Sequence, residues 1–171
     1  MDGTAIIALF VASIAHQEWN YCHSSQGCLG RADEVPVYSV SAGAVRFKHK
    51  FEKSEVYLRY GFDRRYGPFQ PVVGLSYVDS GNAWAGLGGA WNMFERNGFY
   101  GELSVMTGLY ENSDAADLGN ALEFRSGLEL GYEWDNGMRF GLSVDHRSNA
   151  NISDENPGME TVQLRVSVPV H

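Results

Sequence analysis

From Pro36 onward the sequence alternates apolar and polar residues with a period of two, which is the pattern of β-strands that have two different faces. The alternation divides into eight segments: 36–47, 53–63, 68–79, 82–94, 98–111, 120–134, 137–148 and 159–170. Most of these segments are about ten residues or longer, whereas strands of soluble proteins usually contain about five or six. Long strands in this number predict an all-β chain that closes into an eight-stranded antiparallel barrel.

The same alternation suits two environments, because a soluble barrel buries its apolar face and a membrane barrel turns that face to the lipid. In segment 120–134 the polar face alternates Glu and Arg, as in Glu123, Arg125 and Glu129, which suits a narrow lumen filled by ion pairs. Aromatic residues that suit a girdle at the membrane surface lie near the short turns. They are Trp91, Tyr132 and Trp134. Strand length, charge pattern and aromatic positions together favour a transmembrane barrel over a soluble barrel that binds an apolar ligand.

The connections between the segments alternate in length, which is typical of a bacterial outer-membrane barrel. Short turns are expected at 63–67, 95–98 and 135–137, and longer loops at 111–119 and 149–158. We therefore predict an outer-membrane location, with the short turns on the periplasmic side. No apolar run reaches the roughly 20 residues of a transmembrane helix.

Residues 1–35 form a separate N-terminal segment, and 36–171 form the predicted barrel domain. The apolar run from Ala5 to Ala15 is either a remnant of a signal peptide or a segment packed on the domain, and residues 16–35 are expected to be an irregular loop or plug. Cys22 and Cys28 fit a local disulfide in an oxidising compartment, free thiols or, with more ligands, a metal site. The net charge of −8 argues against nucleic acid as a partner.

The clearest chemical signal is His146, followed by Ser148 and, after an irregular polar run, by Glu160. These are the side chains of a serine hydrolase. Their even numbers continue the apolar face of the last two strands, so they are expected to point toward lipid at the loop-bearing rim. A histidine and a carboxylate on that face are costly unless they have a function.

Around these residues we expect groups that stabilise an oxyanion or position the catalytic side chains: Asn149, Asn156 and the backbone N–H of Gly158. Asp145 and Arg147 have the opposite parity and are expected to form structural ion pairs in the lumen. The basic run from Arg46 to Lys50 would lie in the first extracellular loop, where it either contacts lipid phosphates or is solvated. No metal and no cofactor are expected, because no cluster has ligand spacing.

The pattern His146-x-Ser148-Asn149-Ala150, followed by Asn156-x-Gly158-x-Glu160, resembles the lipid A 3-O-deacylase (PagL-type) family of eight-stranded outer-membrane barrels. The resemblance implies a hydrolase that removes the 3-O-linked acyl chain from lipid A of lipopolysaccharide, with His146, Ser148 and Glu160 as its catalytic triad and Asn156 as an oxyanion or positioning residue. It implies lipid A and membrane lipid as partners of a monomer or homodimer. The alternative is a non-enzymatic small barrel with a structural or adhesive role.

Overall fold

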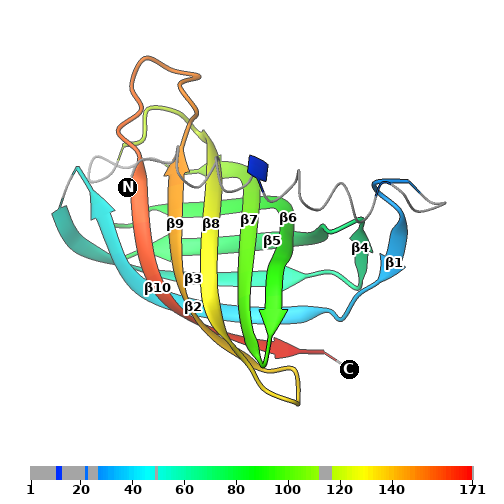
Figure 1. Ribbon diagram of the computed structural model, residues 1–171. Helices are drawn as coiled ribbons and strands as arrows, with labels where there is room; N and C mark the ends of the chain where they lie inside the picture. Colours follow the sequence, from blue (N-terminus) through cyan, green and yellow to red (C-terminus); the bar gives the residue numbers. More distant parts are fainter. Residues whose placement is uncertain (1–10, 13–21, 23–26, 49, 112–116, 171) are drawn as a thin grey trace.

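The barrel of the computed structural model closes through eight antiparallel strands in the order β10-β2-β3-β5-β6-β7-β8-β9 (Figure 1). The structure describes residues 11–12, 22, 27–48, 50–111 and 117–170. The barrel strands are β2 (Val37–Phe47), β3 (Lys50–Gly61), β5 (Gln70–Val78), β6 (Ala83–Arg96), β7 (Phe99–Tyr110), β8 (Leu122–Glu133), β9 (Arg139–Ser148) and β10 (Met159–Pro169). Each of the segments expected from the sequence overlaps one of these strands, so the predicted fold is confirmed.

Closure depends on the pairing of the first and last barrel strands. β10 pairs with β2 along its whole length, from Met159 opposite Phe47 to Pro169 opposite Val37. A closed ladder leaves no strand edge with unpaired N–H and C=O groups, which is the condition for crossing the hydrocarbon region. No helix in the described part of the chain is long and apolar enough to cross a membrane.

Two short strands lie outside the barrel and were not expected. β1 (Arg31–Asp33) pairs with β4 (Arg64–Tyr66) beside the end that carries the short turns (Figure 1). The prediction of an irregular stretch was therefore wrong for β1, and the predicted turn at 63–67 contains β4. Three residues are too few to show a period of two, so the pattern could not reveal either strand.

The N-terminal segment is described only in part. Cys22 and Cys28 form a disulfide, which resolves the alternatives that the sequence left open for them. Most of the apolar run at 5–15 lies outside the described residues, and its role as a signal remnant or packed segment stays a prediction.

The apolar face of the strands points outward and the polar face points into the lumen. Many leucines on one face of the strands are about half exposed or more, whereas charged residues of the opposite parity are buried. The exposed leucines include Leu58, Leu75, Leu87, Leu130, Leu142 and Leu164. This is the arrangement of a membrane barrel, and it contradicts the soluble alternative.

The lumen is held together by buried ion pairs at its centre. Glu55 accepts from Arg147 at 2.6 Å and from Arg125 at 2.9 Å, and Arg125 also contacts Asp145 at 3.3 Å. Gln163 Nε2 donates to Glu55 Oε1, the oxygen that Arg125 also contacts, at 2.9 Å. All five side chains are almost fully buried. The expectation that Asp145 and Arg147 are structural lumen residues is confirmed.

An aromatic cluster marks the end with the short turns. Tyr132 packs edge-on against Phe99 and Trp134, with ring centroids 5.4 and 5.7 Å away, and all three rings are exposed. This cluster has the position and exposure of a membrane-surface girdle. Trp91 also lies near this end, as expected, but unlike the other rings it is buried, with 3% of its surface exposed; it packs against Phe69, with ring centroids 5.2 Å apart.

Replacing Glu55 by Gln should destabilise the barrel by about 3 kcal/mol, because two buried guanidinium groups lose their shared carboxylate. The matched control is Asp63→Asn, which removes an exposed partner of Arg64 and should change stability by less than about 1 kcal/mol. Urea unfolding in detergent micelles, followed by tryptophan fluorescence, measures both. Equal midpoints for the two variants would contradict a stabilising lumen network.

Candidate functional site

The three side chains expected to act together do lie on the outer face at the loop-bearing end of the barrel. Glu160 on β10 is the direct cross-strand partner of His146 on β9. Directly opposite residues of an antiparallel pair have Cβ atoms about 5 Å apart, so a carboxylate and an imidazole there are within reach of each other. Ser148 follows two residues after His146 on the same face, with its Cα about 7 Å farther along the strand.

The His146–Glu160 pair belongs to a longer polar row. Ser126 on β8 is opposite His146, and Arg46 on β2 is opposite Glu160. The row therefore crosses four neighbouring strands at one level. Within it, Arg46 Nη1 donates to Glu160 Oε2 at 2.6 Å.

The row directly beneath it, two residues deeper on each strand, is entirely apolar. Its members are direct cross-strand neighbours of one another. They are Leu128, Val144, Val162 and Ala44. On these four strands the outer face is thus polar at the level of His146 and apolar at the next level beneath it.

The loop between β9 and β10 is organised by Asn149, which is fully buried. Its side-chain nitrogen lies 3.0 Å from the carbonyl oxygen of Leu118, 2.8 Å from that of Glu155 and 2.8 Å from Ser153 Oγ. Its own backbone N–H donates to Asn156 Oδ1 at 3.2 Å. These bonds tie the loop to itself and to the neighbouring loop through Leu118.

These contacts refine what was expected of the two asparagines. The amide of Asn149 is directed at loop carbonyls, and the amide of Asn156 donates to Asn151 Oδ1 at 2.9 Å. Both residues therefore fit a positioning role better than direct donation to an oxyanion.

Gly158 places the returning chain against the imidazole. Its φ of +66° is in the region that favours glycine, and a Cβ built on it would lie 3.2 Å from His146 Cε1. A cavity of about 80 Å³ opens here, lined by Arg46, Lys48, His146, Pro157, Gly158 and Glu160. It is large enough for a small polar group beside the imidazole.

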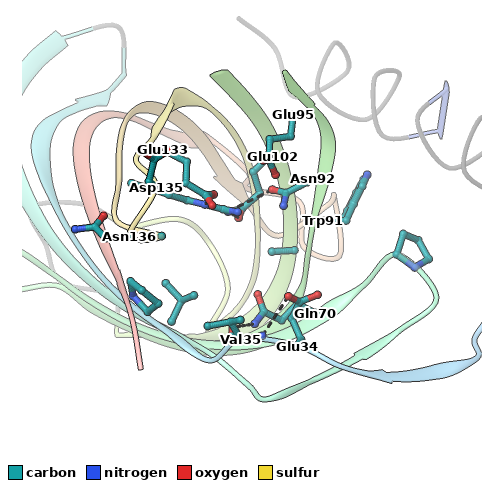
Figure 2. Close-up of a pocket in the computed structure, with 16 residues that line it drawn as sticks. Glu34, Val35, Gln70, Trp91, Asn92, Glu95, Glu102, Glu133, Asp135 and Asn136 are labelled. Carbon is teal, nitrogen blue, oxygen red and sulfur yellow. Dashed lines mark hydrogen bonds and ion pairs between the residues drawn. The ribbon is translucent and has the colours of Figure 1, made fainter. Parts of the chain in front are cut away.

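A larger cavity of about 490 Å³ lies at the opposite end of the barrel, near the short turns (Figure 2). Three of its charged groups contact one another: Arg139 lies 2.5 Å from Glu133 and 3.6 Å from Glu102. Gln70 donates to the carbonyl oxygens of Val35 and Phe62. These polar groups serve the fold, and the cavity is remote from His146.

Among the described residues, no group of three or more His, Cys, Asp or Glu side chains is arranged to hold a metal ion. The side chains around the small cavity and on the same face include a hydroxyl, an imidazole, a carboxylate and a guanidinium group.

Comparison with known proteins gives a family. A family model described as lipid A 3-O-deacylase (PagL) matches residues 58–169, which is well over half of the chain and includes His146, Ser148 and Glu160. The chain belongs to the lipid A 3-O-deacylase (PagL) family. A lipid A deacylase PagL of Bordetella bronchiseptica is 35% identical over 68 residues, which are 39% of this chain and 38% of that protein, well under two thirds of its length.

Solved structures agree with the fold. The crystal structure of the outer-membrane enzyme PagL matches with a TM-score of 0.62 at 18% identity, and covers 78% of this chain and 99% of the matched one. The crystal structure of Neisserial surface protein A matches with a TM-score of 0.59 at 12% identity, over 82% of this chain and 99% of the matched one. The chain is thus an outer-membrane β-barrel of the PagL family.

Two members of the polar row were missed from the sequence. Ser126 was detectable, because a hairpin centred on Asn136 places residues equally distant from it opposite each other, as 126 and 146 are. Arg46 fell at the end of the expected strand 36–47 but was interpreted as part of a basic run in the following loop, whereas it belongs to β2, which continues to Phe47. Its neighbour β10 is the last strand of the barrel, so no turn in the sequence indicates what lies opposite Arg46.

Replacing Asn149 by Ala should loosen the 149–158 loop, because it removes a buried amide that donates to the carbonyl oxygens of Leu118 and Glu155, at a cost of about 1–3 kcal/mol in all. Endoproteinase Glu-C, which cleaves after Glu155, should then cut the loop faster than in the unmodified protein. Ile152→Ala, an exposed position in the same loop, is the control and should leave the cleavage rate unchanged. Equal rates in Asn149→Ala and the control would contradict the organising role.

Proposed function

We propose that this chain is an esterase that releases the 3-O-linked acyl chain of lipid A, with Ser148 as nucleophile, His146 as general base and Glu160 as the residue that orients the imidazole. The observation that carries the proposal is the register of β9 and β10, which sets Glu160 directly opposite His146 on the lipid-facing side. The family match covers all three residues and supports the assignment.

In the proposed reaction His146 accepts the hydroxyl proton as Ser148 Oγ attacks the carbonyl carbon of the ester. The bond between that carbon and the sugar oxygen then breaks, and His146 returns the proton to the leaving oxygen. Water, activated by the same imidazole, hydrolyses the acyl-enzyme and releases the fatty acid. Glu160 stabilises the imidazolium that forms in each half of the cycle.

The oxyanion that forms at the carbonyl needs donors that are fixed in advance. The backbone N–H of Gly158 is our candidate, because Gly158 lies against the imidazole and borders the small cavity. In this proposal Asn149 and Asn156 contribute indirectly, because they hold the loop that carries Gly158 in place.

The depth of the site supports an ester of a membrane lipid as substrate. The polar row that contains His146 lies directly above an apolar row at Val144 and Val162. A lipid lying against this face has its acyl chains along the apolar part, so its ester groups reach the level of His146. A soluble ester would need no site that faces the lipid.

Ser148→Ala should abolish acyl release, with a loss of about 1000-fold or more in rate, while the barrel still folds. Ser126→Ala is a matched control, because Ser126 flanks His146 from the other strand and should be dispensable. Mass spectrometry of lipid A incubated with each purified variant measures the loss of the acyl chain. Full activity in Ser148→Ala would refute the nucleophile, and unchanged lipid A with the unmodified protein would favour the non-enzymatic alternative.

Gly158→Ala should lower the rate of acyl release by about tenfold or more, because the added methyl group displaces the imidazole and small displacements of catalytic groups are costly. The control is Gly81→Ala: Gly81 also has a positive φ, of +92°, but a Cβ there would meet nothing within 4 Å. Both variants carry comparable backbone strain, and only Gly158→Ala should lose activity in the lipid A assay. Equal activities would show that contact with His146 is unimportant.

A further inference from the structure

Arg46 is the residue of the polar row whose contact with the proposed triad is best defined. Its guanidinium donates to Glu160 Oε2 at 2.6 Å, and the two residues are direct partners across the closing strand pair β10–β2. Both side chains are mostly shielded, with exposed fractions of 29% and 23%. Arg46 also precedes the matched residues 58–169, so the family match assigns it no role.

The Glu160 carboxylate lies between two side chains of the neighbouring strands. Arg46 and His146 approach Glu160 from opposite sides, because β2 and β9 flank β10. Arg46 contacts Oε2, so the proposal gives Oε1 the role of acceptor for the imidazole. A charge-assisted hydrogen bond of this kind restrains a carboxylate more firmly than a neutral one.

A carboxylate on the outer face of a membrane barrel also borders a medium of low polarity, which solvates its charge poorly. Without a cation nearby, the charged form that a histidine needs as its partner would be disfavoured there. A guanidinium in contact with the carboxylate offsets this cost, and it does so from β2, on the side of β10 away from the nucleophile Ser148.

We propose that Arg46 is a positioning residue that keeps Glu160 charged and oriented toward His146, so that the catalytic relay runs across three strands as Arg46–Glu160–His146 and ends on Ser148. This inference rests on the esterase function proposed above. It predicts that Arg46 contributes to the chemical step and not to the capture of the lipid headgroup.

The competing role is recognition of an anionic headgroup, because Arg46 and Lys48 line the same small cavity. The two roles differ in what they demand of the substrate. If the arginine binds a phosphate, its removal should raise KM, and only for a phosphorylated lipid. If it positions Glu160, its removal should lower kcat for every ester.

The test compares Arg46→Met and Arg46→Lys with the unmodified protein in detergent micelles. Arg96→Met is the matched control, because Arg96 is an exposed arginine at the end with the short turns. Each protein is assayed on phosphorylated lipid A and on an uncharged p-nitrophenyl acyl ester, and the labelling rate of Ser148 by a fluorophosphonate probe is measured. Heat-dependent mobility on gels reports folding of each variant.

We expect Arg46→Met to lower kcat about 10- to 100-fold on both substrates and to slow probe labelling similarly, with KM changed less than about twofold. Arg46→Lys should recover part of the loss, because it keeps the charge without the forked geometry. Arg96→Met should behave as the unmodified protein.

A loss confined to phosphorylated lipid A and to KM would overturn the proposal in favour of headgroup binding, and full activity of Arg46→Met would overturn it outright. If Arg46→Met fails to fold, the Arg46→Lys comparison decides by the same criteria. Inactivity of the unmodified protein on both substrates would refute the esterase function itself, an outcome distinct from an active protein that tolerates Arg46→Met.

Discussion

The structure depends on the requirement that a chain in lipid pairs all of its backbone polar groups. The eight-stranded ladder meets this requirement only when β10 closes on β2. Closure fixes the register of every strand, and the register in turn fixes which side chains face lipid and which face the lumen. Both the buried charge network and the row of polar residues on the outer face follow from this single constraint.

Strand β9 shows how closely the two faces are coupled. Asp145 and Arg147 point into the lumen, where Arg147 contacts Glu55 at 2.6 Å and Asp145 contacts Arg125 at 3.3 Å. His146 lies between these two residues and Ser148 follows them, and both point to the outer face as members of the proposed active site. The ion pairs inside the barrel therefore hold the backbone that presents a histidine and a serine outside, which gives the site a rigid support.

The sequence predicted the barrel, its eight strands and the outward direction of His146, Ser148 and Glu160, because a period of two carries that information without knowledge of partners. It could not predict β1 and β4, which are too short for a pattern, or the burial of Trp91, whose ring contact Phe69 comes from another connection. Contacts between two strands of a hairpin could have been predicted from the sequence, because the position of the turn fixes which residues lie opposite each other. The Arg46–Glu160 contact could not, because it crosses the closure, and the register there depends on the whole barrel.

The change from polar to apolar residues on the outer face explains why a charged site is tolerated in a membrane barrel. Charged side chains cost about 2–4 kcal/mol at the bilayer midplane but about 0–1 near its surfaces. On β9, β10 and β2 the change falls at one level, above Val144, Val162 and Ala44. We infer that on these three strands this level lies where hydrocarbon meets headgroups, so that an ester-linked acyl chain has its carbonyl group here. The same boundary that limits the cost of His146 and Glu160 thus brings the proposed scissile bond to them.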